Sequence, residues 1–250
     1  MKNKIADFRS DEFYDEKYDD ESWLTQREKD GVALINRIKS YRVFKKGDKM
    51  LDAGCGSGDM AKAIMKKYGV VAYGTDLNKV AIRRANGVGV KAKIANLDEK
   101  WPYEDSFFNS VIAAEIIEHV INPDNFLSEA KRVLKKNGYL VITTPNLASW
   151  FNRMIFLFGY QPFFTEVSTI DKTMGLKFTR RLTPNRDTMG HIRVFTLKAL
   201  RDMLEMYGFN IVAEKGSTVY YLPKYMVPFD YLFKYTPSLS TDMTIIARKK

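Results

Sequence analysis

The stretch KMLDAGCGSG, residues Lys49 to Gly58, decides the fold of this 250-residue chain. A short apolar run opens it, as is typical of a buried central strand, and Gly54, Gly56 and Gly58 follow at alternate positions. Glycines at this spacing remove the Cβ atoms from one side of a tight strand-to-helix turn, so a ligand can contact the backbone itself. The residues after Asp59 are typical of the helix that follows. Strand, glycine turn and helix together open a nucleotide-binding α/β unit.

The spacing of the glycines indicates which nucleotide the turn binds. A dinucleotide-binding loop has Gly-x-Gly-x-x-Gly, whereas this chain has Gly-x-Gly-x-Gly with Asp52 two residues ahead. The Lys-Ser/Thr pair of a phosphate-binding loop does not follow. An acidic residue beside the turn favours a ligand with a cationic end over a diphosphate.

Composition and charge restrict the remaining possibilities. The chain is 45% hydrophobic, which fits one large domain or a domain with a subdomain, and it carries a formal net charge of +10. The positive charge favours an acidic partner or surface without choosing nucleic acid over lipid phosphate or an anionic metabolite. Cys55 is the single cysteine, so we expect a cytoplasmic protein without internal disulfides. No stretch approaches the ~18–20 apolar residues of a membrane span.

Polar residues follow the next two predicted strands at their carboxyl ends. Residues 70–74 predict a second strand, and Asp76 at its tip is placed to accept both hydroxyls of a ribose, with Leu77 beside it. Asn78 is predicted to cap the helix that follows. Residues 90–95 predict a third strand, after which Asn96 and the backbone of Leu97 can bind an adenine edge. Asp98 is a weaker candidate for that contact and is expected to be a solvated loop acid.

The alternation of strands and helices continues along the chain. Residues 107–114 predict a fourth strand, and Asn122 with Pro123 is a strong helix-start signal after it. That helix is predicted to end at Asn137-Gly138, and residues 139–144 predict a fifth strand. This rhythm predicts an α/β protein whose mainly parallel sheet is buried on both faces.

These motifs occur in the order and at the intervals found in a known family. They are residues 51–58, Asp76, Asn96-Leu97, Glu115 to Val120, and Arg132 to Asn146. Together they resemble the class I S-adenosylmethionine-dependent methyltransferases, in the branch of the ubiquinone- and menaquinone-biosynthesis enzymes and many sugar and lipid methyltransferases. The resemblance is close over about residues 45–146 and looser over 190–207. It implies a Rossmann-like, doubly wound, seven-stranded and mostly parallel sheet with a reversed last strand at residues 243–247.

The resemblance also implies a cofactor and the residues that bind it. The cofactor is S-adenosyl-L-methionine, which becomes S-adenosyl-L-homocysteine. The methionine end would lie along the glycine turn, the ribose at the second strand tip and the adenine after the third strand, so the expected cofactor-binding residues are Asp52, Gly54, Cys55, Gly56, Gly58, Asp76, Leu77, Asn96, Leu97 and Glu115. Asn96 stands where relatives often carry an acid, but an amide oxygen can still accept a hydrogen bond.

Three residues are candidates for the catalytic step. The methyl carbon of a sulfonium is already electrophilic, so the protein mainly aligns an acceptor and excludes water, although a hydroxyl acceptor also benefits from a base. In the resembling enzymes a Glu-His pair after strand four often borders the acceptor, which makes Glu118 and His119 candidates, with His191 as the other histidine of the chain. The alternative for His119 is a structural histidine bonded to backbone. We expect no metal site.

The domain organisation follows from these motifs. Residues 1–44 predict a leading helical segment that covers the cofactor, 45–146 the cofactor-binding core, 147–190 an insertion, and 191–250 the end of the core with a second aromatic insertion at about 218–238. The first insertion is aromatic between Trp150 and Phe164 and then basic at Lys172, Lys177, Arg180, Arg181, Arg186 and Arg193. Both insertions are expected to form a lid or small subdomain over an acceptor with apolar and anionic parts. Subdomain core with solvated arginines is the alternative.

The acceptor therefore remains open at this stage. A small-molecule, sugar or lipid-linked acceptor is expected, together with peripheral contact to an anionic membrane through an amphipathic lid helix. A nucleic-acid methyltransferase is the first alternative, but Cys55 lies in the cofactor turn, and Ala114 to Ile117 replaces the Asn/Asp-Pro-Pro-aromatic motif of the exocyclic-amine enzymes. The second alternative is a non-enzymatic module that binds the cofactor.

Overall fold

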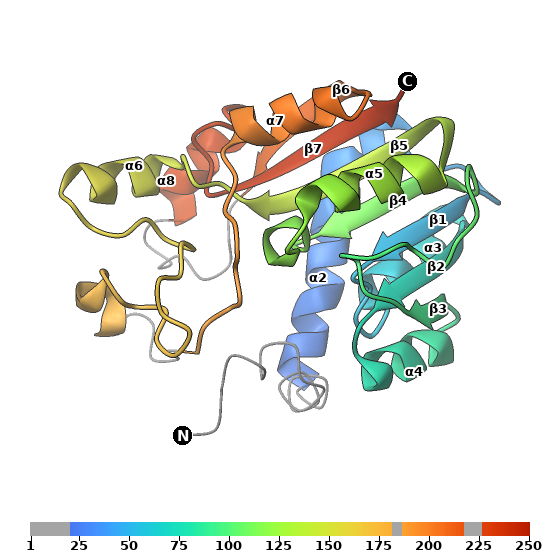
Figure 1. Ribbon diagram of the computed structural model, residues 1–250, viewed down its shortest axis with the longest axis horizontal. Helices are drawn as coiled ribbons and strands as arrows, with labels where there is room; N and C mark the ends of the chain where they lie inside the picture. The colour runs from blue at the N-terminus through green and yellow to red at the C-terminus, as the bar shows by residue number, and fades with distance from the viewer. Residues whose placement is uncertain (1–20, 182–186, 218–226) are drawn as a thin grey trace.

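A computed structural model describes residues 21–181, 187–217 and 227–250, and these form one seven-stranded sheet with helices on both faces (Figure 1). The strand order is β3-β2-β1-β4-β5-β7-β6. Strands β1 to β5 pair in parallel, whereas β7 is antiparallel to both β5 and β6. The predicted doubly wound α/β sheet with a reversed last strand is confirmed. The strands are β1 Lys49–Ala53, β2 Val71–Asp76, β3 Lys91–Ile94, β4 Phe108–Ala114, β5 Leu134–Pro145, β6 Phe209–Ser217 and β7 Asp242–Lys249.

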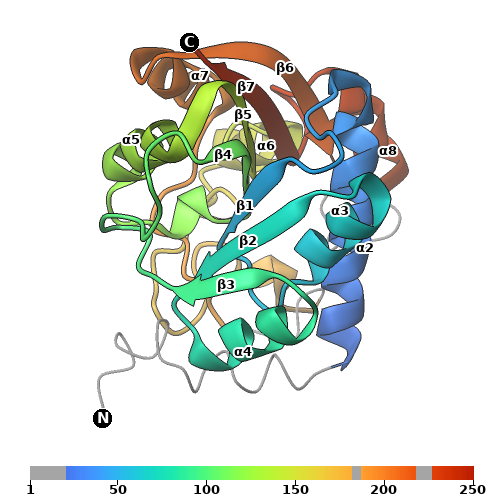
Figure 2. The ribbon, with the colours of Figure 1, turned by 90° about the vertical axis from the view of Figure 1, so that its right-hand side faces the viewer.

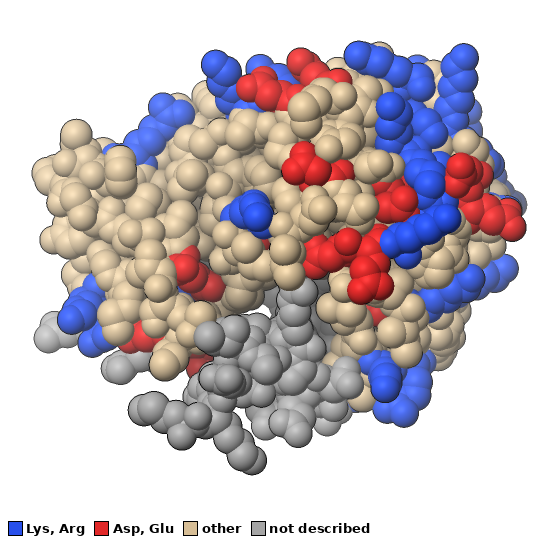
Figure 3. All heavy atoms as spheres, viewed as in Figure 1, with Lys and Arg blue, Asp and Glu red and all other residues tan. Residues whose placement is uncertain are grey.

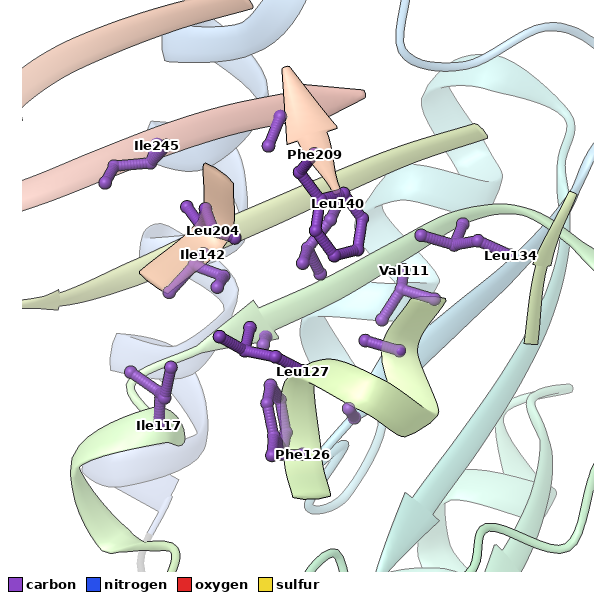
Figure 4. Packing of buried hydrophobic residues seen from close by; sticks show 14 of the residues in the cluster. Val111, Ile117, Phe126, Leu127, Leu134, Leu140, Ile142, Leu204, Phe209 and Ile245 are labelled. Carbon is purple, nitrogen blue, oxygen red and sulfur yellow. The ribbon is translucent and has the colours of Figure 1, made fainter. Parts of the chain in front are cut away.

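The helices divide between the two faces of the sheet (Figure 2). The helices α2, α3 and α4 cover one face and α5 and α7 the other, because side chains that alternate along each strand join two separate apolar clusters. Leu51 of β1 belongs to the cluster under α5 and α7, part of which Figure 4 shows, and Met50 to the cluster under α2 and α3. The described helices are α2 Glu21–Ile38, α3 Asp59–Tyr68, α4 Lys79–Gly87, α5 Pro123–Val133, α6 Trp150–Leu157, α7 Leu197–Met206 and α8 Val227–Tyr231.

Two predicted helix starts are confirmed by their hydrogen bonds. The Asn78 side chain accepts a hydrogen bond from the Ala81 N–H at 2.7 Å and caps α4. The Asn122 side chain accepts one from the Asn125 N–H at 3.0 Å, with Pro123 in the first turn of α5. Each side-chain oxygen satisfies a backbone donor that the first helical turn leaves without a partner.

The boundary between α5 and β5 differs from the prediction. The helix ends at Val133, and β5 begins at Leu134 instead of Tyr139. Leu134 is fully buried and pairs with Phe108 of β4, after which the register shifts. The apolar pattern of the sequence fits Leu134 equally well at the end of the helix or at the start of a strand. Its burial against β4 favours the strand. Asn137, where the sequence predicts the helix end, has a φ of 63° and lies within β5, in the irregular stretch between the pair of Leu134 with Phe108 and the pair of Tyr139 with Ser110.

The insertions lie where parallel strands end. Figure 1 shows α6 and the ribbon that follows it beyond the carboxyl ends of β4 and β5. A hydrogen bond from the Leu147 N–H to the Phe195 carbonyl, 2.9 Å long, joins the start of the insertion to the chain that leaves it. Helix α2 packs along α3, while residues 1–20 of the predicted leading segment lie outside the described residues. None of the described helices is long and apolar enough to cross a bilayer.

Candidate active site

The glycine turn has the geometry that its spacing predicts. Gly54, Gly56 and Gly58 all have positive φ, at 76°, 52° and 83°. The N–H groups of Gly54 and Cys55 both donate to the Thr75 carbonyl, at 2.8 and 2.9 Å, which ties the turn to the end of β2. A Cβ on Gly54 would lie 2.1 Å from Cδ1 of Ile116, so a larger residue there would require Ile116 to shift and would also be strained at positive φ. The turn therefore contacts the segment that follows β4.

Neighbouring side chains of the turn are packed inside the protein. Asp52 is 1% exposed and lies in β1 between Gly74 of β2 and Ile112 of β4. Cys55 is buried, and a Cβ on Gly74 would lie 2.6 Å from its sulfur. The Cys55 side chain thus fills space against β2, and a contact with the predicted cofactor would come from its backbone.

Asp76 joins the glycine turn to the start of α4. Its Oδ2 accepts a hydrogen bond from the Gly56 N–H and its Oδ1 accepts one from the Asn78 N–H, both 2.9 Å long. The Asp76 carboxylate at the tip of β2 therefore holds the glycine turn and the start of α4 together. The sequence predicts that the ribose binds at this carboxylate. Leu77, next to it, is 44% exposed.

The loop after β3 differs in part from its prediction. The side-chain oxygen of Asn96 accepts a hydrogen bond from the Asp98 N–H at 3.0 Å and closes a local turn, and Leu97 is buried. Asp98 is not the solvated loop acid that the sequence indicates, because its Oδ1 accepts hydrogen bonds from the N–H groups of Ile121 and Asn122, at 2.7 and 2.9 Å. Asp98 thus fixes this loop against the start of α5, a contact between segments that sequence spacing does not reveal.

Glu115 begins the segment after β4. Its φ is 56°, and its Oε1 accepts a hydrogen bond from Thr143 Oγ1 of β5 at 2.6 Å. Burial, then the nearby carboxylates of Asp242 and Glu118, raise the pKa of Glu115 well above its ordinary value, against the Thr143 hydrogen bond and Arg37, which lower it. The carboxylate therefore leans toward β5, and its predicted contact with the cofactor remains a prediction.

The structure brings together the three predicted catalytic residues. Glu118 and His119 lie in a 3-10 turn, Ile117–His119, directly after β4, and His191 approaches from the far end of the insertion. One ligand atom from each lies within 4.8 Å of the others, and the two imidazole centres are 4.9 Å apart. Glu118 is fully buried, and its Oε2 accepts a hydrogen bond from Thr144 Oγ1 at 2.9 Å.

Backbone carbonyls set the orientation of both imidazoles. His119 Nδ1 lies 3.0 Å from the Gly190 carbonyl oxygen, and His191 Nδ1 lies 3.2 Å from that of Phe164. A carbonyl oxygen only accepts, so each Nδ1 carries a proton and the lone pair of a neutral ring is on Nε2. Burial, helped by His119, lowers the pKa of His191 to about 3. The hydrogen bond to the Gly190 carbonyl fits the structural role considered for His119. The position of its ring beside His191 also fits the catalytic role.

Glu166 supports this arrangement, although the sequence gives no signal for it. Its carboxylate accepts hydrogen bonds from the N–H groups of Met189 and Gly190, at 2.6 and 2.8 Å. The Gly190 carbonyl that binds His119 is therefore held in place from within the insertion. A single Glu in a loop carries no periodicity or motif, so only the folded chain identifies it.

A row of aromatic rings connects both insertions with the histidines. Successive ring centres lie 4.9 to 6.2 Å apart along Phe233, Trp150, Phe151, Phe163, Phe164, His191 and His119. Trp150 Nε1 also donates to Oδ1 of Asp230 at 2.8 Å, which links α6 to α8. Contacts of this kind bring together two aromatic segments that the sequence separates by about sixty residues.

Some of the basic residues expected to bind an anion have structural partners instead. Arg180 forms an ion pair with Asp171 at 2.8 Å, and Arg193 donates to the Ile121 carbonyl at 2.7 Å. Arg186 and the side chain of Arg181 lie outside the described residues. Lys172 and Lys177 form no ion pair with another described residue, and their contact with an anionic group remains a prediction. On the face in Figure 3, Lys and Arg alternate with Asp and Glu over the sheet, and the side that carries α6 is largely uncharged.

Known proteins share this fold and its motifs. A family model described as a methyltransferase domain matches residues 23–214. Norajmaline N-methyltransferase of Rauvolfia serpentina is 34% identical over 39% of this chain and 36% of its own length. The ubiquinone biosynthesis O-methyltransferase of Pelagibacter ubique is 32% identical over 47% of this chain and 50% of its own length. The chain thus spans about half or less of these relatives.

A solved structure supports the same fold. The phosphoethanolamine N-methyltransferase 2 of Haemonchus contortus, in complex with S-adenosyl-L-methionine, superposes with a TM-score of 0.62 at 16% identity, over 97% of this chain and 60% of that one. The family model covers well over half of the chain and includes the glycine turn, Asp76 and the Glu118-His119 pair. The chain therefore belongs to the methyltransferase-domain family, the class I S-adenosyl-L-methionine-dependent methyltransferases.

Proposed function

We propose that the protein transfers the methyl group of S-adenosyl-L-methionine to an oxygen of a small-molecule, sugar or lipid-linked acceptor that has apolar and anionic parts. The observation that carries this proposal is the cluster of Glu118, His119 and His191, whose ligand atoms lie within 4.8 Å of one another. Ile116, two residues before Glu118, packs against Gly54 of the cofactor turn. This contact supports a position of the cluster near the expected methyl group of the cofactor.

The cofactor residues divide by element. We assign the methionine end to the turn from Asp52 to Gly58 and the ribose to Asp76 with Leu77. We assign the adenine to the loop at Asn96 and Leu97. The positive φ of Gly54, Gly56 and Gly58 and the hydrogen bond from Gly56 to Asp76 support this assignment, because they bring backbone and carboxylate to one edge of the sheet.

The chemistry of the cluster favours a hydroxyl acceptor. A neutral amine attacks through its own lone pair, whereas a hydroxyl is a good nucleophile only after it loses its proton. As the new C–O bond forms, the C–S bond breaks, sulfur keeps the electron pair, and the hydroxyl proton leaves to a nearby base or water. The Glu118 carboxylate and the Nε2 lone pair of His119 at the acceptor side suit this proton loss, whereas the low pKa of His191 makes its ring a weaker base.

The insertions suit the remainder of the acceptor. The aromatic row from Phe233 to Phe164 offers an apolar surface that ends at His191, and Lys172 and Lys177 are available for an anionic group. We assign residues 147–190 and the segment at about 218–238 as the lid over the acceptor, and residues 1–44 as the cover of the cofactor. The hydrogen bond between Trp150 and Asp230 supports a lid that moves as one unit.

The outer side of α6 suits a membrane surface. Phe156, Leu157 and Phe158 are consecutive and are 67, 81 and 71% exposed, and Met154 is 54% exposed. Large apolar side chains that are exposed together on a short helix are typical of a surface that rests in the headgroup region of a bilayer. We propose that α6 makes this peripheral contact, which would bring a lipid-linked acceptor to the site.

Two matched acceptors test the proposal. The protein is incubated with methyl-labelled cofactor and one apolar scaffold that carries either a hydroxyl or a primary amine, in parallel with fractions of an extract of its source. Label on the hydroxyl compound supports O-methylation, and label on the amine alone overturns it. Cofactor binding without transfer to any fraction would favour a non-enzymatic module, and label that nuclease treatment releases would favour the nucleic-acid alternative.

A further inference from the structure

The sequence predicts no metal site, and Glu118-His119 lies far from His191 in the chain. The fold places one carboxylate and two imidazoles within 4.8 Å of one another. We infer that Glu118, His119 and His191 bind one first-row divalent transition ion, such as Zn²⁺. This inference deepens the proposed function and rests on it for the role of the ion.

The donor set and its size fit such an ion. Two imidazoles and one carboxylate are a combination typical of catalytic zinc and of other first-row ions, whereas Mg²⁺ prefers oxygen ligands and water. Bonds of about 2.0–2.2 Å place ligand atoms roughly 3–4 Å apart, so atoms within 4.8 Å need only small rotations to close on an ion. Three protein ligands leave coordination positions for an acceptor oxygen or water.

The partners of each ligand favour coordination. The Nδ1 atoms of His119 and His191 donate to the carbonyls of Gly190 and Phe164, so the coordinating nitrogen of each ring is Nε2. Thr144 holds the Glu118 carboxylate through Oε2. Ligating imidazoles in metalloproteins commonly donate their other N–H to a carbonyl or carboxylate in this way, and ligating carboxylates are likewise hydrogen-bonded.

The backbone also fixes the distance between the two histidines. The N–H groups of Ile192 and Arg193 both donate to the Glu118 carbonyl, at 2.8 and 3.1 Å. The residue after His191 is therefore tied directly to the residue before His119. This contact holds the two segments of the cluster together through the backbone, and a preorganised site loses less entropy when an ion binds.

The ion would act on the acceptor rather than on the cofactor. A hydroxyl bound to a divalent ion loses its proton to water at a lower pH than a free hydroxyl, and the resulting oxygen attacks the methyl carbon as the C–S bond breaks. Because the imidazole lone pairs then bind the ion, the proton leaves to solvent. Methyl transfer, but not cofactor binding, would depend on the ion.

Calorimetry and elemental analysis test the site directly. The full chain, freed of metal by a chelator, is titrated with Zn²⁺, Mn²⁺ and Mg²⁺, and bound metal is counted by mass spectrometry. We expect one equivalent of Zn²⁺ or Mn²⁺ per chain and binding at least tenfold weaker in Glu118→Gln, His119→Ala and His191→Ala. Glu104→Gln, at an exposed glutamate, is the matched control. Visible absorption bands of added Co²⁺ give a readout that requires no turnover.

The outcomes separate the metal site from the proposed function. Each variant is first checked for unchanged affinity for S-adenosyl-L-methionine, which reports an intact fold. If no ion binds, or if binding survives in the double histidine variant, the metal site is overturned. If methyl transfer persisted in excess chelator, the ion would have no role in the reaction, and the proposed function would still hold. Stoichiometric metal without methyl transfer would support the site and count against the proposed function.

Discussion

The Asp76 carboxylate and the Gly56 N–H are joined by a 2.9 Å hydrogen bond. The second carboxylate oxygen of Asp76 accepts a hydrogen bond from the Asn78 N–H. Asp76, which we expect to bind the ribose, therefore also holds the cofactor turn and the start of α4 in place. The protein's own hydrogen bonds thus hold the expected cofactor site together, and a preorganised site loses less entropy on binding.

Substitution of Asp76 by alanine should weaken binding of S-adenosyl-L-methionine. The change removes two hydrogen bonds to a charged acceptor and the proposed ribose contacts, so we expect a loss of affinity of roughly 10- to 100-fold. Isothermal calorimetry measures it, with Asp202→Ala at an exposed position of α7 as the control. Unchanged affinity in Asp76→Ala would refute the ribose assignment.

Two glycine substitutions separate backbone strain from steric overlap. Gly54 and Gly47 have similar φ values, 76° and 83°, but a Cβ meets Ile116 at 2.1 Å in the first and nothing within 4 Å in the second. Gly47→Ala should cost about 1–2 kcal/mol of unfolding free energy from positive φ alone. Gly54→Ala should cost about 1–3 kcal/mol more from overpacking and also impair cofactor binding. Equal losses in urea unfolding would mean that Ile116 moves aside freely.

Glu129 should contribute to the free energy of unfolding in a pH-dependent way. Burial alone would raise the pKa of Glu129, but hydrogen bonds from Arg132 and from the Trp101 N–H lower it below its ordinary value. A lowered folded pKa means that this stabilisation is present above the unfolded carboxyl pKa of about 4.3 and is lost as pH falls through the folded value. Glu129→Gln should therefore lose about 1–3 kcal/mol at pH 7. The deficit should shrink below pH 4, as thermal unfolding at several pH values would reveal.

The aromatic row should affect the acceptor and not the cofactor. Phe163 lies between Phe151 and Phe164, so its truncation to alanine removes apolar contact at the middle of the row. We expect the KM for an apolar acceptor to rise roughly tenfold, with unchanged affinity for S-adenosyl-L-methionine. Phe163→Leu, which keeps most of the volume, should fall between the two. If Phe163→Ala weakened cofactor binding and left the KM for the acceptor unchanged, the assignment of the aromatic row to the acceptor site would be wrong.

Vesicle sedimentation tests the membrane contact of α6. The double change Phe156→Ser and Leu157→Ser removes two side chains that are 67 and 81% exposed. Binding to vesicles that contain anionic phospholipid should fall at least roughly tenfold, because each buried side chain contributes about 1.5–3 kcal/mol. Met206→Ser, 68% exposed on α7, should bind like the unmodified protein. Equal binding of all three proteins would exclude α6 as the contact.

Residue patterns by themselves determined the strand-and-helix order, the glycine turn, the helix caps at Asn78 and Asn122, and the family. These features depend on contacts close in the chain, where turn geometry and apolar periodicity leave a direct signal. The start of β5 at Leu134 and the role of Asp98 required the tertiary structure, because each depends on a partner in another segment. The tertiary structure also brought His191 to Glu118 and His119, and Trp150 to Asp230. Distances between remote segments follow from sheet order and packing, and no local pattern encodes them.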